Sequence, residues 1–151
     1  MRFTLDSNIL VRAVTSPLGP ALRLVDLVLE SHTLILSSFI LDEVERVLLY
    51  PRIQSRYRIT ADEAIRFTRN LSEAAHLVEP TIVKPVALSD PDDDAVLYTA
   101  AAGKADILCT RNTRHFSSPS VKVFCDEHAL RVMTDLEALH ELFADSGGAQ
   151  E

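Results

Sequence analysis

The stretch FTLDSNIL, residues 3–10, contains the change from strand to helix on which the predicted fold is built. Its first three residues favour a short buried strand, and its last two begin the apolar face of a helix. Ser7 and Asn8 can each cap that helix, because both side chains offer an oxygen to the free backbone N–H groups of a first turn. Asp6 is then left over at the carboxyl end of the strand, where a carboxylate without a capping role suggests a functional site.

The same order of strand and helix recurs along the rest of the chain. Apolar runs predict further strands at residues 33–36, 77–78, 107–109 and 131–133, and helical spacing predicts helices at 21–30, 39–49, 91–102, after Thr60 to about 75, and after Thr134 to 143. Short apolar strands that alternate with helices are typical of a parallel sheet covered on both faces. We therefore predict one α/β domain over residues 1–143, a five-stranded parallel sheet flanked by helices on both faces, and a disordered tail at 144–151.

The composition is that of a globular domain. Of 151 residues, 47% are hydrophobic and 25% are charged, which suffices for a full core without staples. No apolar run reaches the roughly 20 residues that cross a bilayer, and Asp6 interrupts the region where a signal peptide would be apolar. We therefore expect a cytoplasmic protein with no membrane partner. Cys109 and Cys125 are too few for a disulfide framework or a zinc site.

The net charge of −7 argues against nucleic-acid binding through a generally basic surface. However, 12 of the 15 basic residues are arginines, which suit planar phosphate recognition. A divalent metal held by clustered acids would also reverse the local charge that an anionic substrate meets.

Acidic residues follow the predicted strands, and in parallel α/β sheets ligands bind outside the carboxyl ends of the strands. Besides Asp6, Glu43 borders the apolar stripe of the helix at 39–49, where a carboxylate is costly unless something receives it. The alternative for Glu43 is an ion pair with an arginine. Asp42 shares the solvated face of Glu45 and Arg46 and is not a candidate.

The stretch DPDDD, residues 90–94, combines a helix start with four acids. Asp90 is the expected cap, and the helix dipole accounts for Asp92 in the first turn. Asp93 precedes apolar residues at helical spacing and is expected to point along the buried face. Asp94 shares part of that orientation and is the second choice.

The fourth strand leads into further polar residues. Thr110 and Asn112 are placed to offer oxygen atoms beside Asp6, whereas His115 is read as an ordinary surface residue of a turn. Three carboxylates from distant parts of the chain repel one another and favour a hard cation with oxygen ligands. We expect Mg²⁺ or Mn²⁺, because zinc would usually bring histidine or cysteine.

These residues resemble the PIN-domain ribonucleases, and specifically the toxins of bacterial and archaeal toxin–antitoxin operons. The resemblance runs from Arg2 to about Phe143. It rests on four motifs in order: LDSNIL at 5–10, SFILDEV at 38–44, DPDDD at 90–94 and ILCTRN at 107–112.

The resemblance implies a five-stranded parallel sheet and an acidic pocket that binds Mg²⁺ or Mn²⁺ and hydrolyses RNA phosphodiester bonds. The implied metal ligands and catalytic residues are Asp6, Glu43 and Asp93, with Asp94 close by and with Ser7 and Asn8 orienting the first. It also implies a cognate antitoxin and a homodimer. Many family members carry aspartate where this chain has Asn112, so a second metal position would lack a charge here.

The densest basic stretch, which could guide an RNA backbone or simply be solvated, comprises Arg46, Arg52, Arg56, Arg58, Arg66 and Arg69. One alternative function is a non-catalytic module of the same fold that binds RNA or a partner protein. Another is a phosphoryl-transfer enzyme or phosphoacceptor domain. A dehalogenase-type phosphatase would want two aspartates around Ser7, and a receiver-type domain would want its acceptor aspartate after a later strand. Neither pattern is present.

Overall fold

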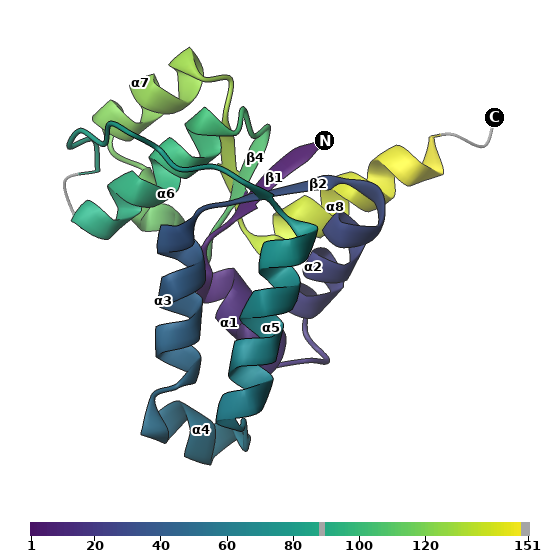
Figure 1. Ribbon diagram of the computed structural model, residues 1–151. Helices are drawn as coiled ribbons and strands as arrows, with labels where there is room; N and C mark the ends of the chain where they lie inside the picture. The colour runs from purple at the N-terminus through teal and green to yellow at the C-terminus, as the bar shows by residue number, and fades with distance from the viewer. Residues whose placement is uncertain (88–89, 149–151) are drawn as a thin grey trace.

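Strands and helices alternate along the chain in the computed structural model, which describes residues 1–87 and 90–148 (Figure 1). The strands are β1 (Arg2–Leu5), β2 (Thr33–Leu36), β3 (His76–Leu77), β4 (Ile107–Cys109) and β5 (Arg131–Met133). The helices are α1 (Ser7–Thr15), α2 (Pro20–Ser31), α3 (Ser38–Leu48), α4 (Pro51–Tyr57), α5 (Ala61–Ala74), α6 (Pro91–Ala102), the 3₁₀ helix η1 (Thr113–Phe116), α7 (Pro119–Glu127) and α8 (Asp135–Gly147).

The five strands form one parallel sheet in the order β3-β2-β1-β4-β5. The first strand is central: Phe3 pairs with Leu34 on one side and with Ile107 on the other. Figure 1 shows α6 and α7 on one side of this sheet and α2 and α8 on the other. The predicted five-stranded parallel sheet with helices on both faces is confirmed. The chain builds the sheet from β1 to one side through β2 and β3, and then crosses to the other side of β1 with β4 and β5. The carboxyl ends of β1 and β4 therefore lie side by side at this switch point, where α/β sheets bind ligands.

The core is built on the central strands. Phe3, Leu5 and Leu108 are completely buried, as parallel strands covered on both faces should be. Close packing extends to the end of α6, where a Cβ atom added to Gly103 would lie 2.1 Å from Cγ2 of Ile35. Helix α6 therefore approaches β2 more closely than any side chain at this position would allow. In the described residues, no helix combines the length and the apolar character needed to cross a membrane.

Several boundaries differ from those predicted. Helix α8 continues to Gly147, so residues 144–147 are helical rather than part of a tail, and residues 149–151 lie outside the described part of the chain. Strand β3 starts at His76, one residue earlier than expected. Helix α7 was not predicted, although its signal is present: Ser118 caps it by accepting from the Val121 N–H, and a proline follows at the first helical position.

Candidate active site

Three carboxylates reach the carboxyl edge of the central strands from three elements. Asp6 lies between β1 and α1, Glu43 lies on α3, and Asp93 lies in the first turn of α6. Asp6 and Asp93 are buried and Glu43 is partly buried. The negative charges of Glu43 and Asp93 both help to raise the pKa of Asp6, so the three groups share one electrostatic environment.

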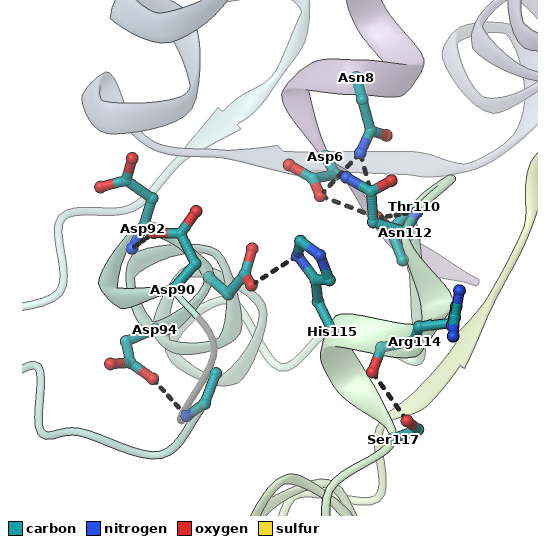
Figure 2. A network of polar contacts seen from close by, with 12 residues as sticks. Asp6, Asn8, Asp90, Asp92, Asp94, Thr110, Asn112, Arg114, His115 and Ser117 are labelled. Atoms are coloured by element: carbon teal, nitrogen blue, oxygen red, sulfur yellow. Dashed lines mark hydrogen bonds and ion pairs between the residues drawn. The ribbon is translucent and has the colours of Figure 1, made fainter.

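Asp6 is the N-cap of α1, which corrects the expectation that Ser7 or Asn8 would take that position. Its Oδ1 accepts the Ser7 N–H at 2.8 Å, as a capping carboxylate does. Its Oδ2 accepts from the Thr110 hydroxyl at 2.9 Å and from Nδ2 of Asn8 at 3.3 Å (Figure 2). Capping and a place in the site are thus combined in one side chain, because its two oxygens serve different partners.

Burial dominates the electrostatics of Asp6. Desolvation raises its pKa from 3.8 to about 6, against the hydrogen bonds from Thr110 and Ser7, which lower it. Glu43 and Asp93 add smaller contributions that raise it. An ionised Asp6 is therefore costly in the protein alone, and a positive charge beside it would be stabilising.

Asp93 is paired with His115, which the sequence analysis named and set aside as a surface residue. Its Oδ2 lies 3.2 Å from Nδ1 of His115, which the 3₁₀ helix η1 brings over from β4 (Figure 2). The same oxygen is buried, and His115 is the polar side chain next to it. Burial raises the pKa of Asp93, and the neighbouring His115 opposes that rise. The signal that could have found His115 is its place just after β4, at the sheet edge that carries the acids.

Asp94 is buried but is directed away from Asp6 (Figure 2). Its Oδ1 accepts the backbone N–H groups of Val86 at 2.9 Å and Ala87 at 2.7 Å. This carboxylate therefore anchors the segment before α6. The structure does not bring it together with Asp6.

Glu43 takes the ion pair that the sequence left open as an alternative. Its Oε1 lies 3.7 Å from the Arg46 guanidinium, one helical turn further along α3. The pair does not remove Glu43 from the site, since Arg46 is largely exposed and a pair at this distance is weak. Asp42 is exposed, as expected.

Thr110 joins the elements that meet at the site. Its hydroxyl donates to Asp6 and accepts from Nδ2 of Asn8 at 3.3 Å and from the Asn112 N–H at 3.1 Å. Oδ1 of Asn8 accepts the Arg111 N–H at 3.1 Å. The predicted neighbourhood of Ser7, Asn8 and Thr110 around Asp6 is present. Asn112 lies beside Thr110 with an exposed side chain, and its role as an oxygen ligand stays a prediction.

The residues fit a hard divalent cation in chemical type. All the candidate donors are oxygens, Oδ2 of Asp93 is buried without a hydrogen bond, and the charges of Asp6 and its neighbours repel one another. Among residues 1–87 and 90–148, no group of three or more histidine, cysteine, aspartate or glutamate side chains has the spacing of a formed metal site.

The buried acids lie at the carboxyl ends of the central strands, which is where parallel α/β sheets bind their ligands. The family model for the PIN domain matches residues 2–114. The chain belongs to the PIN-domain family.

Two solved structures show the same fold at low sequence identity. One is a chain in the crystal structure of VapBC2 from Rickettsia felis bound to a DNA fragment from their promoter, with a TM-score of 0.57, 16% identity, and 89% of this chain and 98% of that chain covered. The other is a chain of VapBC-1 from nontypeable Haemophilus influenzae, with a TM-score of 0.56, 16% identity, and 90% and 99% covered. No curated protein matches the sequence.

Proposed function

We propose that this protein is a metal-dependent endoribonuclease that hydrolyses RNA phosphodiester bonds and acts as the toxin of a toxin–antitoxin pair. The convergence of Asp6, Glu43 and Asp93 on one edge of the sheet carries the proposal. Membership of the PIN-domain family and the likeness in fold to chains of VapBC complexes support it.

Asp6, Glu43 and Asp93 would hold Mg²⁺ or Mn²⁺, which when bound would neutralise phosphate charge and acidify a water molecule for attack on phosphorus. The chain itself fixes the geometry. Thr110 and Asn8 hold Oδ2 of Asp6, and the Ser7 N–H holds Oδ1, so this carboxylate has one orientation. Oδ2 of Asp93 is buried 3.2 Å from Nδ1 of His115.

The test is cleavage of single-stranded and structured RNAs in Mg²⁺, in Mn²⁺ and in EDTA. We expect cleavage with either metal, none in EDTA, and none for Asp6→Asn. Asp42→Asn is the matched control, because Asp42 is exposed on the same helix as Glu43 and should keep full activity. Cleavage that survives exhaustive chelation would exclude this mechanism.

A second candidate is a non-catalytic PIN module that binds RNA or a protein. It is favoured by Asn112, a neutral amide at a position where many family members carry aspartate. Binding of RNA without cleavage in any divalent metal would select it.

The proposed partner is an antitoxin protein, since both structural neighbours are chains of VapBC assemblies. Co-expression with the product of the adjacent reading frame should yield a stable complex that no longer cleaves RNA. We also propose a homodimer, which sedimentation of the isolated protein would detect.

A further inference from the structure

A hollow of about 350 Å³ adjoins the acidic site. It lies between α1, α3 and α4, and α4 packs at the end of α3 that is far from α6 (Figure 1). Its walls combine the apolar side chains of Val11, Val47 and Ile53 with the aromatic ring of Tyr57. The volume is at the lower end of the roughly 300–1,000 Å³ typical of small-ligand sites, enough for one planar group rather than a whole domain surface.

Two residues connect the hollow to the acidic site. Asn8 lines the hollow, donates to Asp6 through Nδ2, and accepts the Arg111 N–H through Oδ1. Ser7, whose N–H caps onto Asp6, lines it as well. Two residues that contact Asp6 therefore also line the hollow, so the hollow lies next to a chain held at Asp6.

The charge of the hollow is opposite to that of the whole molecule. Arg12 and Arg111 contribute to its lining, and none of the described residues that line it is acidic, although the chain carries a net charge of −7. The Arg56 guanidinium lies 5.3 Å from the centre of the Tyr57 ring and adds a third positive charge at the edge.

Arg111 also forms an ion pair with a buried acid outside the hollow. Its guanidinium lies 3.9 Å from Oδ2 of Asp135, whose side chain is only 4% exposed. Oδ2 of Asp135 accepts no hydrogen bond, so this ion pair is the contact that offsets its burial. The pair lies on the side of Arg111 that belongs to α8, and Arg111 also lines the hollow.

We propose that this hollow is a base pocket that binds one nucleobase flanking the scissile phosphate of a single-stranded RNA. Tyr57 stacks on the base, and Arg12 and Arg111 contact the phosphates on either side of it. The proposal rests on the ribonuclease function proposed above and adds to it the side chains that would receive one base of the substrate.

The chemistry of the lining favours a nucleobase over a peptide. Unpaired RNA bases are typically recognised by stacking on aromatic rings or guanidinium planes, with arginines along the backbone. An aromatic ring, two arginines and apolar walls beside a phosphodiester-cleaving site match that pattern. A protein segment in the same hollow is the competing outcome of the test.

The first experiment compares the kinetics of RNA cleavage in wild type, Tyr57→Ala, Tyr57→Phe and Tyr50→Ala. Tyr57→Ala should raise KM by about 5- to 150-fold, the range of base–aromatic stacking, and leave kcat unchanged. Tyr57→Phe should restore the wild-type KM, because the ring is kept. Tyr50 is the matched control, an exposed tyrosine that lines a different hollow with Asp42 and Glu45. Helix α4 buries none of its residues, so these variants should fold normally, as circular dichroism would check.

The second experiment measures stacking of a base on Tyr57 through the fluorescence of this tyrosine. The chain has no tryptophan and three tyrosines, so Tyr50→Phe/Tyr98→Phe leaves Tyr57 as the reporting fluorophore. A single-stranded RNA oligonucleotide in EDTA should quench this fluorescence, and an oligonucleotide with an abasic residue at the pocket position should quench it less.

The outcomes separate the base pocket from the proposed function. A wild-type protein that neither binds nor cleaves RNA overturns both. A wild-type protein that cleaves RNA with the same KM as Tyr57→Ala overturns the base pocket alone. Unchanged RNA kinetics in Tyr57→Ala together with lost binding of the co-expressed neighbouring protein also overturns it and assigns the hollow to a protein segment.

Discussion

Asp6 caps α1 with one carboxylate oxygen and offers the other to Thr110 and Asn8. Burial raises its pKa to about 6, so between pH 3.8 and about 6 the folded chain binds a proton more tightly than the unfolded chain does. Stability from this group is therefore complete below pH 3.8 and is lost as pH rises through 6, by about 3 kcal/mol in all.

Asp6→Asn should remove that loss. In EDTA at pH 7 the variant should unfold at higher urea concentration than wild type, because the buried charge is gone and the asparagine oxygen still caps the helix. Its NH2 group cannot accept from Thr110, and we expect the loss of this one acceptor to be the smaller effect. The difference should shrink as pH falls to 4. A variant that is less stable than wild type at pH 7 would show that the hydrogen bonds outweigh the burial of the charge.

Asp93 and Asp94 are neighbours with different predicted effects. Asp93→Asn should abolish cleavage and leave the melting temperature unchanged or higher, since its charge is buried beside other acids. Asp94→Ala should lower stability by about 1–3 kcal/mol, because the N–H groups of Val86 and Ala87 lose their acceptor. Parallel assays of cleavage and urea unfolding separate the two. Loss of cleavage in a fully folded Asp94→Ala would place Asp94 in the site.

Between elements, the Thr110 hydroxyl links β4 to the start of α1 and to η1. Thr110→Val keeps the shape but leaves three polar groups without this partner, so it should cost about 2–3 kcal/mol in urea unfolding. Thr4→Val is the matched control on β1, because the Thr4 hydroxyl is buried without any hydrogen bond. The control should be neutral or stabilising. Equal losses in both variants would mean that Thr110 contributes only volume.

The close contact between α6 and β2 requires glycine at position 103, which has no side chain. A Cβ atom at Gly103 would collide with Ile35, so Gly103→Ala should cost about 1–3 kcal/mol through overpacking. Gly147 is the control: nothing lies within 4 Å of its added Cβ, and alanine in α8 should stabilise by about 0.5–1 kcal/mol. Thermal unfolding of both variants tests the packing, and an unchanged Gly103→Ala would show that α6 shifts freely.

Capping residues and apolar periodicity predicted the strands and helices correctly where these local signals agreed with the fold. The start of α6 follows from Asp90, Pro91 and the first-turn acids, and the structure shows the same cap. The roles of side chains were predicted wrongly where their partners come from another element of the fold. Helical spacing assigns Asp93 and Asp94 similar orientations. It cannot show that Asp94 accepts the backbone N–H groups of Val86 and Ala87, because those residues precede the helix. His115 was missed for the same reason, since only the turn η1 brings it to Asp93.

At the scale of the whole molecule, the acidic edge should couple metal binding to global stability. Three carboxylates that repel one another lower the stability of the protein alone, and a bound cation stabilises the native state by mass action. Mn²⁺ should therefore raise the melting temperature of the wild type in a concentration-dependent way, with a gain of about 2.7 kcal/mol at 100 times the Kd.

The melting temperature of Asp6→Asn, compared with that of wild type, should depend on whether Mn²⁺ is present. In EDTA this variant should melt above wild type, because it lacks the buried charge, and in saturating Mn²⁺ it should melt below wild type, because it lacks a charged ligand. The ranking of the two proteins then inverts between the two conditions, which a general salt effect cannot produce. Thr4→Val, which changes none of the proposed metal ligands, should shift with Mn²⁺ as much as wild type does. A ranking that stays the same in EDTA and in Mn²⁺ would show that Asp6 does not hold the cation.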